Sequence, residues 1–300
     1  MGARIEETQT EIVAEVDRLR GKRIVFDLPT VTGTENILLA AVLAEGRTEI
    51  FNAAREPHVQ DLCLLLGKMG ARIEGIGTER LVIDGVKDLG GAEHTVVPDY
   101  LEAGTYAIAA AAVGGELRLD CSRPEDLNVV LLKLELAGAH VEVGDGWFRI
   151  GRNPKTRLKP IDMSTWTFPG FPTDLQAQYM AMMTQADGET VISEYVHENR
   201  FQHVNQLAKM GAGINVEGRL HAIVHGPARL QGTEVTIPDI RSGAALVIAA
   251  LCAEGESVLH NAWHVDRGYE NMPGKLASVG AKITSEKVES GADGQDRTYE

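Results

Sequence analysis

The segment at residues 138–150 reads GAHVEVGDGWFRI, and it changes residue pattern within a few positions. Gly138 closes the amphipathic pattern before it, as glycine does just beyond the last turn of a helix. From His140 to Ile150 apolar and polar residues alternate, which is typical of a half-buried strand. Asp145-Gly146 interrupts the alternation, and this pair favours a tight turn between antiparallel strands. The segment therefore predicts a helix end followed by a β-hairpin.

The beginning of this segment recurs along the chain. Gly-Ala, any residue, and then Ile or Val begins at Gly2, Gly70, Gly138, Gly211 and Gly280, with spacings of 68, 68, 73 and 69 residues. A period this regular indicates a repeated structural unit.

Each full unit has the same predicted content. An Ala-rich helix ends at a Gly-containing turn, a short strand follows, and then a second amphipathic helix leads to Gly-Ala. In the first full unit Val59, Cys63 and Leu66 lie on one face of that second helix. A unit therefore reads strand, helix, strand, helix, strand, strand. Because both helices are apolar, we expect them to pack together inside, with the sheets outside.

Composition restricts the class of protein. The 300 residues are 44% hydrophobic and carry a formal net charge of −14, which argues against nucleic acid as the main partner. No apolar run approaches the roughly 20 residues that span a bilayer, and residues 1–7 lack the features of a secretory signal, so we expect a cytoplasmic protein without membrane contact. Cys63, Cys121 and Cys252 form neither a zinc pattern nor a complete disulfide framework. A structural role is favoured over a reactive thiol for Cys121, and the sequence suggests no metal or organic cofactor.

Four motifs connect the repeats to a known family. They are NAAREP at 52–57, FPTDLQAQ at 171–178, ENRF at 198–201 and DRGYE at 266–270. Together with the repeats they resemble the UDP-N-acetylglucosamine 1-carboxyvinyltransferases, which are enolpyruvyl transferases, and the resemblance runs from Gly2 to about Ile283.

The resemblance implies an α/β fold, an inside-out α/β barrel built from these units. The family has two domains of three units each, with the active site in the cleft between them. Residues 1–97 then belong to an incomplete first domain, residues 98–285 form the second domain with three units, and residues 286–300 form a polar tail that frays after Ser290. The first Gly-Ala stands at Gly2, so we expect residues 2–24 to be the last strands of a unit whose helices are absent.

Asp174 is the first candidate site residue. From the residues alone, an Asp in the turn before a helix is either an N-cap or a catalytic carboxylate, and capping is the commoner role. The resemblance implies that Asp174 hydrogen-bonds the 3′-hydroxyl of the sugar and takes part in proton transfer. Val196 matches a residue beside the uracil-sugar pocket.

Arg241 and Arg267 are candidate ligands of an anion, and we expect each to lie at the start of a helix. From the residues alone each is a surface ion-pair partner of a nearby Asp. The resemblance implies that both face the cleft and that Arg267 binds phosphoenolpyruvate, whose charged groups suit a guanidinium. Arg200 either belongs to the site or only stabilises its helix.

Thr30, Val31 and Thr32 open a predicted helix in the first domain. Their hydroxyl groups and the Gly that follows are typical of a helix cap, and also of a cradle for phosphate. The resemblance implies contact with the diphosphate of UDP-N-acetylglucosamine. Leu28 and Tyr100 depart from the family, because some relatives have Lys at the first position and many have Arg at the second.

The reaction implied by the resemblance is the transfer of enolpyruvyl from phosphoenolpyruvate to the 3′-hydroxyl of UDP-N-acetylglucosamine, with release of phosphate. It is the first committed step of peptidoglycan synthesis. Two alternatives stay open: an enzyme like 3-phosphoshikimate 1-carboxyvinyltransferase, and a non-catalytic remnant that binds a nucleotide sugar. The family's Lys-Asn pair, its loop with a reactive Cys or Asp and further arginines have no counterpart here. We therefore expect these 300 residues alone to be inactive, and the full-length protein to be a monomer.

Overall fold

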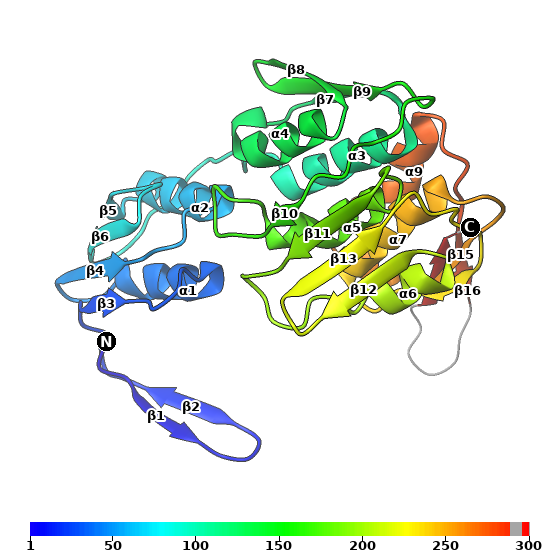
Figure 1. Cartoon of the computed structure of the whole chain (residues 1–300). Helices are drawn as coiled ribbons and strands as arrows, with labels where there is room; N and C mark the ends of the chain where they lie inside the picture. Colours follow the sequence, from blue (N-terminus) through cyan, green and yellow to red (C-terminus); the bar gives the residue numbers. More distant parts are fainter. Residues whose placement is uncertain (289–295, 300) are drawn as a thin grey trace. The chain divides into compact units, whose positions relative to one another are not determined.

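The computed structural model describes residues 1–288 and 296–299. The chain divides into two compact units (Figure 1). Unit 1 comprises Met1–Val97 and Thr167–Pro169, and unit 2 comprises Pro98–Trp166 and Gly170–Glu300.

Unit 1 contains a hairpin and one complete repeat. The hairpin pairs β1 (Arg4–Glu7) with β2 (Ile12–Glu15) in antiparallel fashion. The repeat runs through β3 (Arg23–Val25), α1 (Val31–Ala41), β4 (Arg47–Phe51), α2 (Pro57–Lys68), β5 (Arg72–Glu74) and β6 (Arg80–Asp84). Its sheet has the order β3-β4-β6-β5, in which β3 and β4 are parallel and the other pairs antiparallel.

Unit 2 contains three repeats. The first consists of α3 (Tyr100–Val113), β7 (Gly115–Asp120), the 3-10 helix η1 (Pro124–Leu127), α4 (Asn128–Leu136), β8 (His140–Gly144) and β9 (Trp147–Arg152). The second consists of β10 (Met163–Ser164), the 3-10 helix η2 (Thr173–Leu175), α5 (Gln176–Met183), β11 (Glu189–Ser193), α6 (Val204–Lys209), β12 (Gly213–Glu217) and β13 (His221–His225). The third consists of β14 (Glu234–Thr236), α7 (Ile240–Cys252), β15 (Val258–His260), α8 (Trp263–Asp266), α9 (Met272–Ser278), β16 (Ser285–Val288) and β17 (Asp296–Tyr299).

The repeats of unit 2 share one strand order. The second and third have sheets β10-β11-β13-β12 and β14-β15-β17-β16, which match the sheet of unit 1 position by position. The first has only β7-β9-β8, because residues 85–99 before α3 form no strand. The predicted order of strands and helices is therefore confirmed, apart from this missing first strand.

The first helices of the three repeats form the centre of unit 2. α3, α5 and α7 pack against one another, and the sheets lie outside them (Figure 1). Ala107, Ala181 and Ala245 are completely buried in these helices, and such small side chains allow helix axes to approach closely. This arrangement confirms the predicted α/β fold with inner helices. The second helices bury their predicted apolar faces, as Val130, Leu131 and Leu134 of α4 show.

The polar tail predicted after Ser290 is only partly described. Residues 289–295 and 300 lie outside the described residues, but Asp296–Tyr299 forms β17 and pairs with β16 and β15. Tyr299 is buried, and its hydroxyl donates to Asp266 Oδ1 over 2.5 Å. The prediction of an unstructured tail was therefore wrong at these four residues, because a buried aromatic side chain holds them against the sheet.

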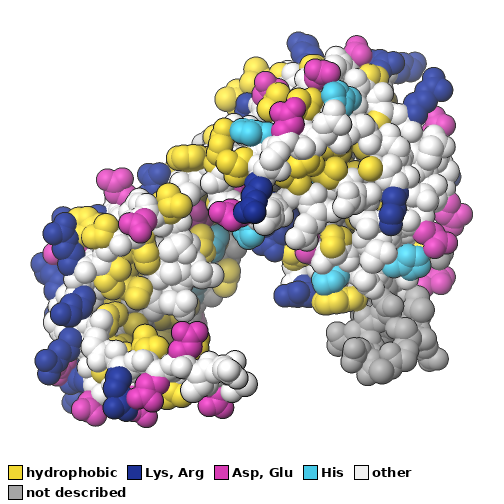
Figure 2. All heavy atoms as spheres, turned by 60° about the horizontal axis from the view of Figure 1, so that its bottom comes forward, with side chains coloured by type: hydrophobic (Ala, Val, Ile, Leu, Met, Phe, Trp, Pro, Cys, Tyr) yellow, Lys and Arg dark blue, Asp and Glu magenta, His cyan; other side chains and the backbone are white. Residues whose placement is uncertain are grey.

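The helices of unit 1 keep apolar side chains at the surface. Leu39 on α1, Leu43 just after it and Leu64 on α2 are each about half exposed. Figure 2 shows such hydrophobic side chains between charged ones on the surface of this unit. The main apolar cluster of unit 1 comprises nine buried residues, whereas a much larger continuous core fills unit 2.

Candidate active site

Asp174 lies in η2, directly before α5, and two guanidinium groups hold its carboxylate. Arg241 donates from Nε to Oδ1 over 2.9 Å and from Nη2 to Oδ2 over 2.8 Å. Arg200 donates from Nη2 to Oδ1 over 2.5 Å. Burial would raise the pKa of Asp174, but the hydrogen bonds and charges of the two arginines outweigh it and lower that pKa. Asp174 is therefore a partly buried, ionised carboxylate with two cationic partners.

Asp174 does not cap a helix. Thr30, Asp99 and Asp239 cap α1, α3 and α7 by accepting backbone N–H groups. Neither η2 nor α5 has a side-chain cap. The capping role, which the residues alone left open for Asp174, is excluded by this geometry.

Thr173 and Glu194 position Arg200 through a chain of hydrogen bonds. Arg200 Nη1 donates to Thr173 Oγ1 over 2.6 Å, and Thr173 Oγ1 donates to Glu194 Oε2 over 2.9 Å. Glu194 is completely buried directly after β11. This chain of hydrogen bonds fixes the guanidinium of Arg200 beside Asp174.

The same glutamate fixes the backbone at Val196. Glu194 Oε1 accepts the backbone N–H of Val196 over 3.0 Å and that of His197 over 2.9 Å. It also accepts the hydroxyl of Thr165 over 2.8 Å. Glu194 therefore joins the turn at Val196 to the segment that carries Asp174.

The sequence analysis did not identify Thr173 or Glu194, and it left Arg200 between two roles. The only available signal was weak: a charged residue at the end of a buried strand, in the same unit as the Asp174 motif. Glu194 is 21 positions from Thr173 and 29 from Thr165. A local sequence pattern does not reveal hydrogen-bond partners this far apart.

Arg241 enters the site from the first turn of α7, as predicted. Asp239 caps that helix by accepting the N–H groups of Arg241 and Ser242 over 2.9 and 3.0 Å. His203 is buried with its Nε2 3.2 Å from Met180 Sδ on α5, and burial lowers its pKa to about 4. The start of α7 is thus held by the Asp239 cap.

Arg267 does not begin a helix, contrary to our expectation. It follows the last residue of the short helix α8. Asn271, in the left-handed region at φ 50°, starts α9 only after an intervening turn, and Pro273 stands in the first turn of α9. Two short helices therefore replace the single predicted one. Arg267 is exposed, and its charge helps to lower the pKa of His264, after burial as the larger cause.

A buried polar network ties the Arg267 segment to Asp174. The Tyr269 hydroxyl lies 2.9 Å from Thr105 Oγ1 on α3. Gln178 Nε2 on α5 donates to the Tyr269 hydroxyl over 3.2 Å and to the backbone oxygen of Asp174 over 2.9 Å. Hydrogen bonds between these inner helices thus limit the relative movement of the Asp174 and Arg267 segments.

The three predicted diphosphate ligands lie in unit 1, away in sequence from the cluster above. Thr30 Oγ1 accepts the N–H of Gly33 over 3.3 Å, so Thr30 acts as the cap of α1. Val31 and Thr32 form the first turn of that helix. Leu28 is exposed, and Tyr100 is buried at the start of α3.

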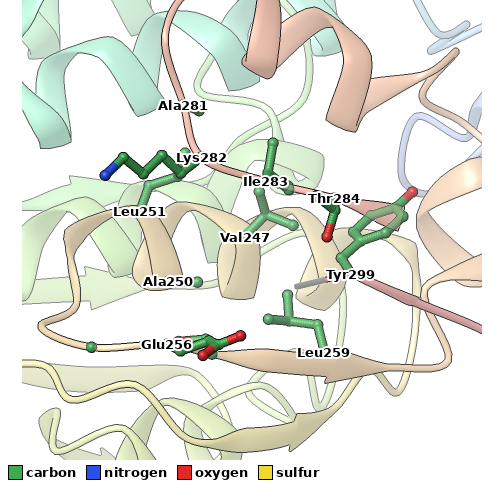
Figure 3. Close-up of a pocket in the computed structure, with 12 residues that line it drawn as sticks. Val247, Ala250, Leu251, Glu256, Leu259, Ala281, Lys282, Ile283, Thr284 and Tyr299 are labelled. Atoms are coloured by element: carbon green, nitrogen blue, oxygen red, sulfur yellow. The ribbon is translucent and has the colours of Figure 1, made fainter. Parts of the chain in front are cut away.

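A cavity of about 520 Å³ lies elsewhere in unit 2. It is lined mainly by apolar side chains of α7, β15 and the segment after α9, including Val247, Leu251, Leu259 and Ile283 (Figure 3). No residue of the Asp174 cluster lines it. The charged groups suited to chemistry therefore do not coincide with this cavity.

Three further observations concern the reactivity of the cysteines, metal binding and membrane-spanning helices. Burial raises the pKa of the Cys63 thiol to about 11 and that of Cys252 to about 12. Within residues 1–288 and 296–299, no three His, Cys, Asp or Glu side chains come together in a way that could hold a metal ion. In the same residues, no helix has the length and apolar character needed to cross a membrane.

Comparison with curated proteins finds close relatives. The chain is 49% identical over 283 residues to the UDP-N-acetylglucosamine 1-carboxyvinyltransferase of Koribacter versatilis, covering 94% of this chain and 65% of the relative. It is 50% identical over 284 residues to the protein of the same name in Acidobacterium capsulatum, covering 94% and 64%. The chain thus spans a little under two thirds of the length of these relatives.

Solved structures agree on the fold. The enolpyruvyl transferase NikO from Streptomyces tendae is 25% identical, with a TM-score of 0.82 over 94% of this chain and 69% of that one. An EPSP synthase from Acinetobacter baumannii is 19% identical, with a TM-score of 0.67 over 93% and 68%, which shows the fold alone.

A family model matches nearly the whole chain, over residues 1–276, and it describes an enzyme class. Together with the relatives above, this match places the chain in the EPSP synthase (3-phosphoshikimate 1-carboxyvinyltransferase) family of enolpyruvyl transferases.

Proposed function

We propose that this chain serves in the transfer of enolpyruvyl from phosphoenolpyruvate to the 3′-hydroxyl of UDP-N-acetylglucosamine, with release of phosphate. The observation that carries the proposal is the Asp174 carboxylate, held by Arg200 and Arg241. A carboxylate that can exchange protons and a pair of cations are what this reaction requires, and both relatives near 50% identity bear the name of this enzyme.

In the proposed reaction C3 of phosphoenolpyruvate is protonated and the sugar hydroxyl adds to C2. Loss of a proton from C3 then expels phosphate and leaves the enol ether. Asp174 binds the hydroxyl and accepts its proton. Arg241 and Arg267 bind the negative groups of phosphoenolpyruvate.

Other residues would hold the nucleotide sugar. Val196 would contact the sugar through the turn that Glu194 fixes. Thr30, Val31 and Thr32 would bind the diphosphate at the start of α1, where backbone N–H groups favour an anion. We further propose that the full-length protein is a cytoplasmic monomer with two domains. Residues 1–97 belong to the first domain, and residues 98–285 form the second.

The alternative acceptor is shikimate 3-phosphate. It is less supported, because the EPSP synthase of known structure is 19% identical whereas the two curated relatives are 49% and 50% identical. The two acceptors can be separated by experiment.

The test is phosphate release by a chimera that joins the N-terminal third of the Koribacter versatilis relative to this chain. We expect release with phosphoenolpyruvate and UDP-N-acetylglucosamine, and none with shikimate 3-phosphate. Asp174→Ala should lower turnover at least about a hundredfold, because it removes a positioned proton acceptor. Asp187→Ala, at an exposed aspartate outside the cluster, is the matched control. A near-normal rate for Asp174→Ala would refute its catalytic role, and release only with shikimate 3-phosphate would favour the alternative.

A further inference from the structure

The carboxylate of Asp174 is occupied in a way that opposes its proposed task. Oδ1 accepts two hydrogen bonds and Oδ2 accepts one, all from guanidinium groups. A carboxylate has about four acceptor positions, so a substrate hydroxyl can still donate to Oδ2. Transfer of the hydroxyl proton to Asp174 is unfavourable, however, because two cations stabilise the ionised carboxylate.

The two arginines are held very differently. Arg200 also donates to Thr173, which is bound to the buried Glu194, and only 17% of its side chain is exposed. The Arg241 guanidinium has Asp174 as its only hydrogen-bond partner among the described residues, and 37% of its side chain is exposed. Of the two cations, Arg241 is therefore the one that can leave.

An anionic substrate is a competitor for that cation. A phosphate or carboxylate group matches the guanidinium fork as the Asp174 carboxylate does. Arg267 is exposed and has no ion-pair partner among the described residues. The next residue, Gly268, packs against Ile240 at the start of α7, since a Cβ at Gly268 would overlap Ile240 Cδ1. An anion held at Arg267 thus has a second guanidinium available at the beginning of α7.

We propose that Arg241 is an exchangeable counterion that covers Asp174 in the empty site and moves to the anionic substrate when this binds. The carboxylate then keeps only Arg200, which positions it, and can take the hydroxyl proton while the O–H electron pair stays on the attacking oxygen. The proposal rests on the proposed function. It makes binding of the anion a condition for base catalysis, so the acceptor hydroxyl is not activated before the donor is present.

The test is nuclear magnetic resonance of the 300-residue chain at constant pH. The signals are the Asp174 side-chain carboxyl carbon, assigned with Asp174→Asn, and the Nε–H groups of Arg241 and Arg267, assigned with Lys variants. Phosphoenolpyruvate is the probe. We expect the Asp174 and Arg241 signals to change together, with the same midpoint as the Arg267 signal.

Two variants isolate the exchange. In Arg241→Gln the Arg267 signal should still respond to phosphoenolpyruvate, while the Asp174 signal should hardly change. Arg229→Gln, at an exposed arginine of the same unit, should behave as the wild type. The proposal is overturned if phosphoenolpyruvate changes the Arg267 signal while the Asp174–Arg241 pair stays unchanged, or if none of the three responds.

Failure of the proposed function would appear separately. It would be seen as absence of phosphate release by the chimera with either acceptor. An active chimera whose Asp174 and Arg241 signals ignore phosphoenolpyruvate would retain the function and reject only the counterion exchange.

Discussion

The buried side chain of Glu194 connects several segments of the candidate site. It accepts hydrogen bonds from two hydroxyl groups and two backbone N–H groups. Glu194→Ala leaves these donors without a partner, and hydrogen bonds to a charged group contribute about 1.5–3 kcal/mol each. We expect the free energy of unfolding, measured with urea, to fall by about 3 kcal/mol or more. Glu198→Ala, at an exposed glutamate of the same segment, should change it by less than about 0.5 kcal/mol. Equal losses in the two variants would contradict this role.

His203 should make stability depend on pH. Its pKa falls from an ordinary value of 6.5 to about 4 in the folded chain, because it is buried. Between these values the unfolded chain binds a proton that the folded chain does not, so stability falls as pH drops from about 6.5 to about 4. A lowering of this size corresponds to about 3 kcal/mol of stability. We expect urea unfolding to show this loss in the wild type relative to His203→Gln. Parallel pH profiles of the two proteins would contradict the prediction.

At the scale of elements, substitution of glycines can test how closely the helices pack against neighbouring residues. A Cβ at Gly243 in α7 would lie 2.5 Å from Val265 Cγ2 and 2.8 Å from Ile237 Cγ2, whereas a Cβ at Gly67 in α2 would meet nothing within 4 Å. Gly243→Ala should therefore lower the free energy of unfolding by about 2 kcal/mol through overpacking. Gly67→Ala should raise it by up to about 1 kcal/mol, because alanine favours a helix. Thermal unfolding of both variants checks this, and stabilisation by Gly243→Ala would mean that α7 can shift.

Sequence patterns predicted elements better than they predicted side-chain partners. The Asp145-Gly146 hairpin forms as expected, because the turn chemistry and the alternation agree locally. The prediction that a helix begins at Arg267 was wrong, because the left-handed backbone at Asn271 divides one apolar pattern into α8 and α9. The Asp174–Arg200–Arg241 cluster depends on contacts across 26 and 67 positions, which no local pattern contains. Only the family resemblance brought Asp174 and Arg241 together in advance.

At the scale of the whole molecule, the two units should unfold separately. Unit 1 has a small core, whose main cluster is nine buried apolar residues, and exposed leucines on both helices, whereas unit 2 has a much larger core. We expect two transitions in scanning calorimetry, with unit 1 unfolding first. Ile83→Ala should lower only the first transition and Leu134→Ala only the second, since each removes a fully buried side chain worth about 2–5 kcal/mol. A single transition that both variants lower equally would show that the units unfold together.

The strand order of the repeats has a consequence for the speed of folding. Among the described residues, every strand pairs only with strands of its own repeat or, for β1 and β2, of its own hairpin. Loop closure for these sheets therefore never exceeds the length of one repeat, although the chain is 300 residues long. Rates of two-state folding fall as contacts become more distant in sequence, so the sheets can assemble early and independently. The late step is then the association of α3, α5 and α7, the helices that also bring the charged groups of the site together.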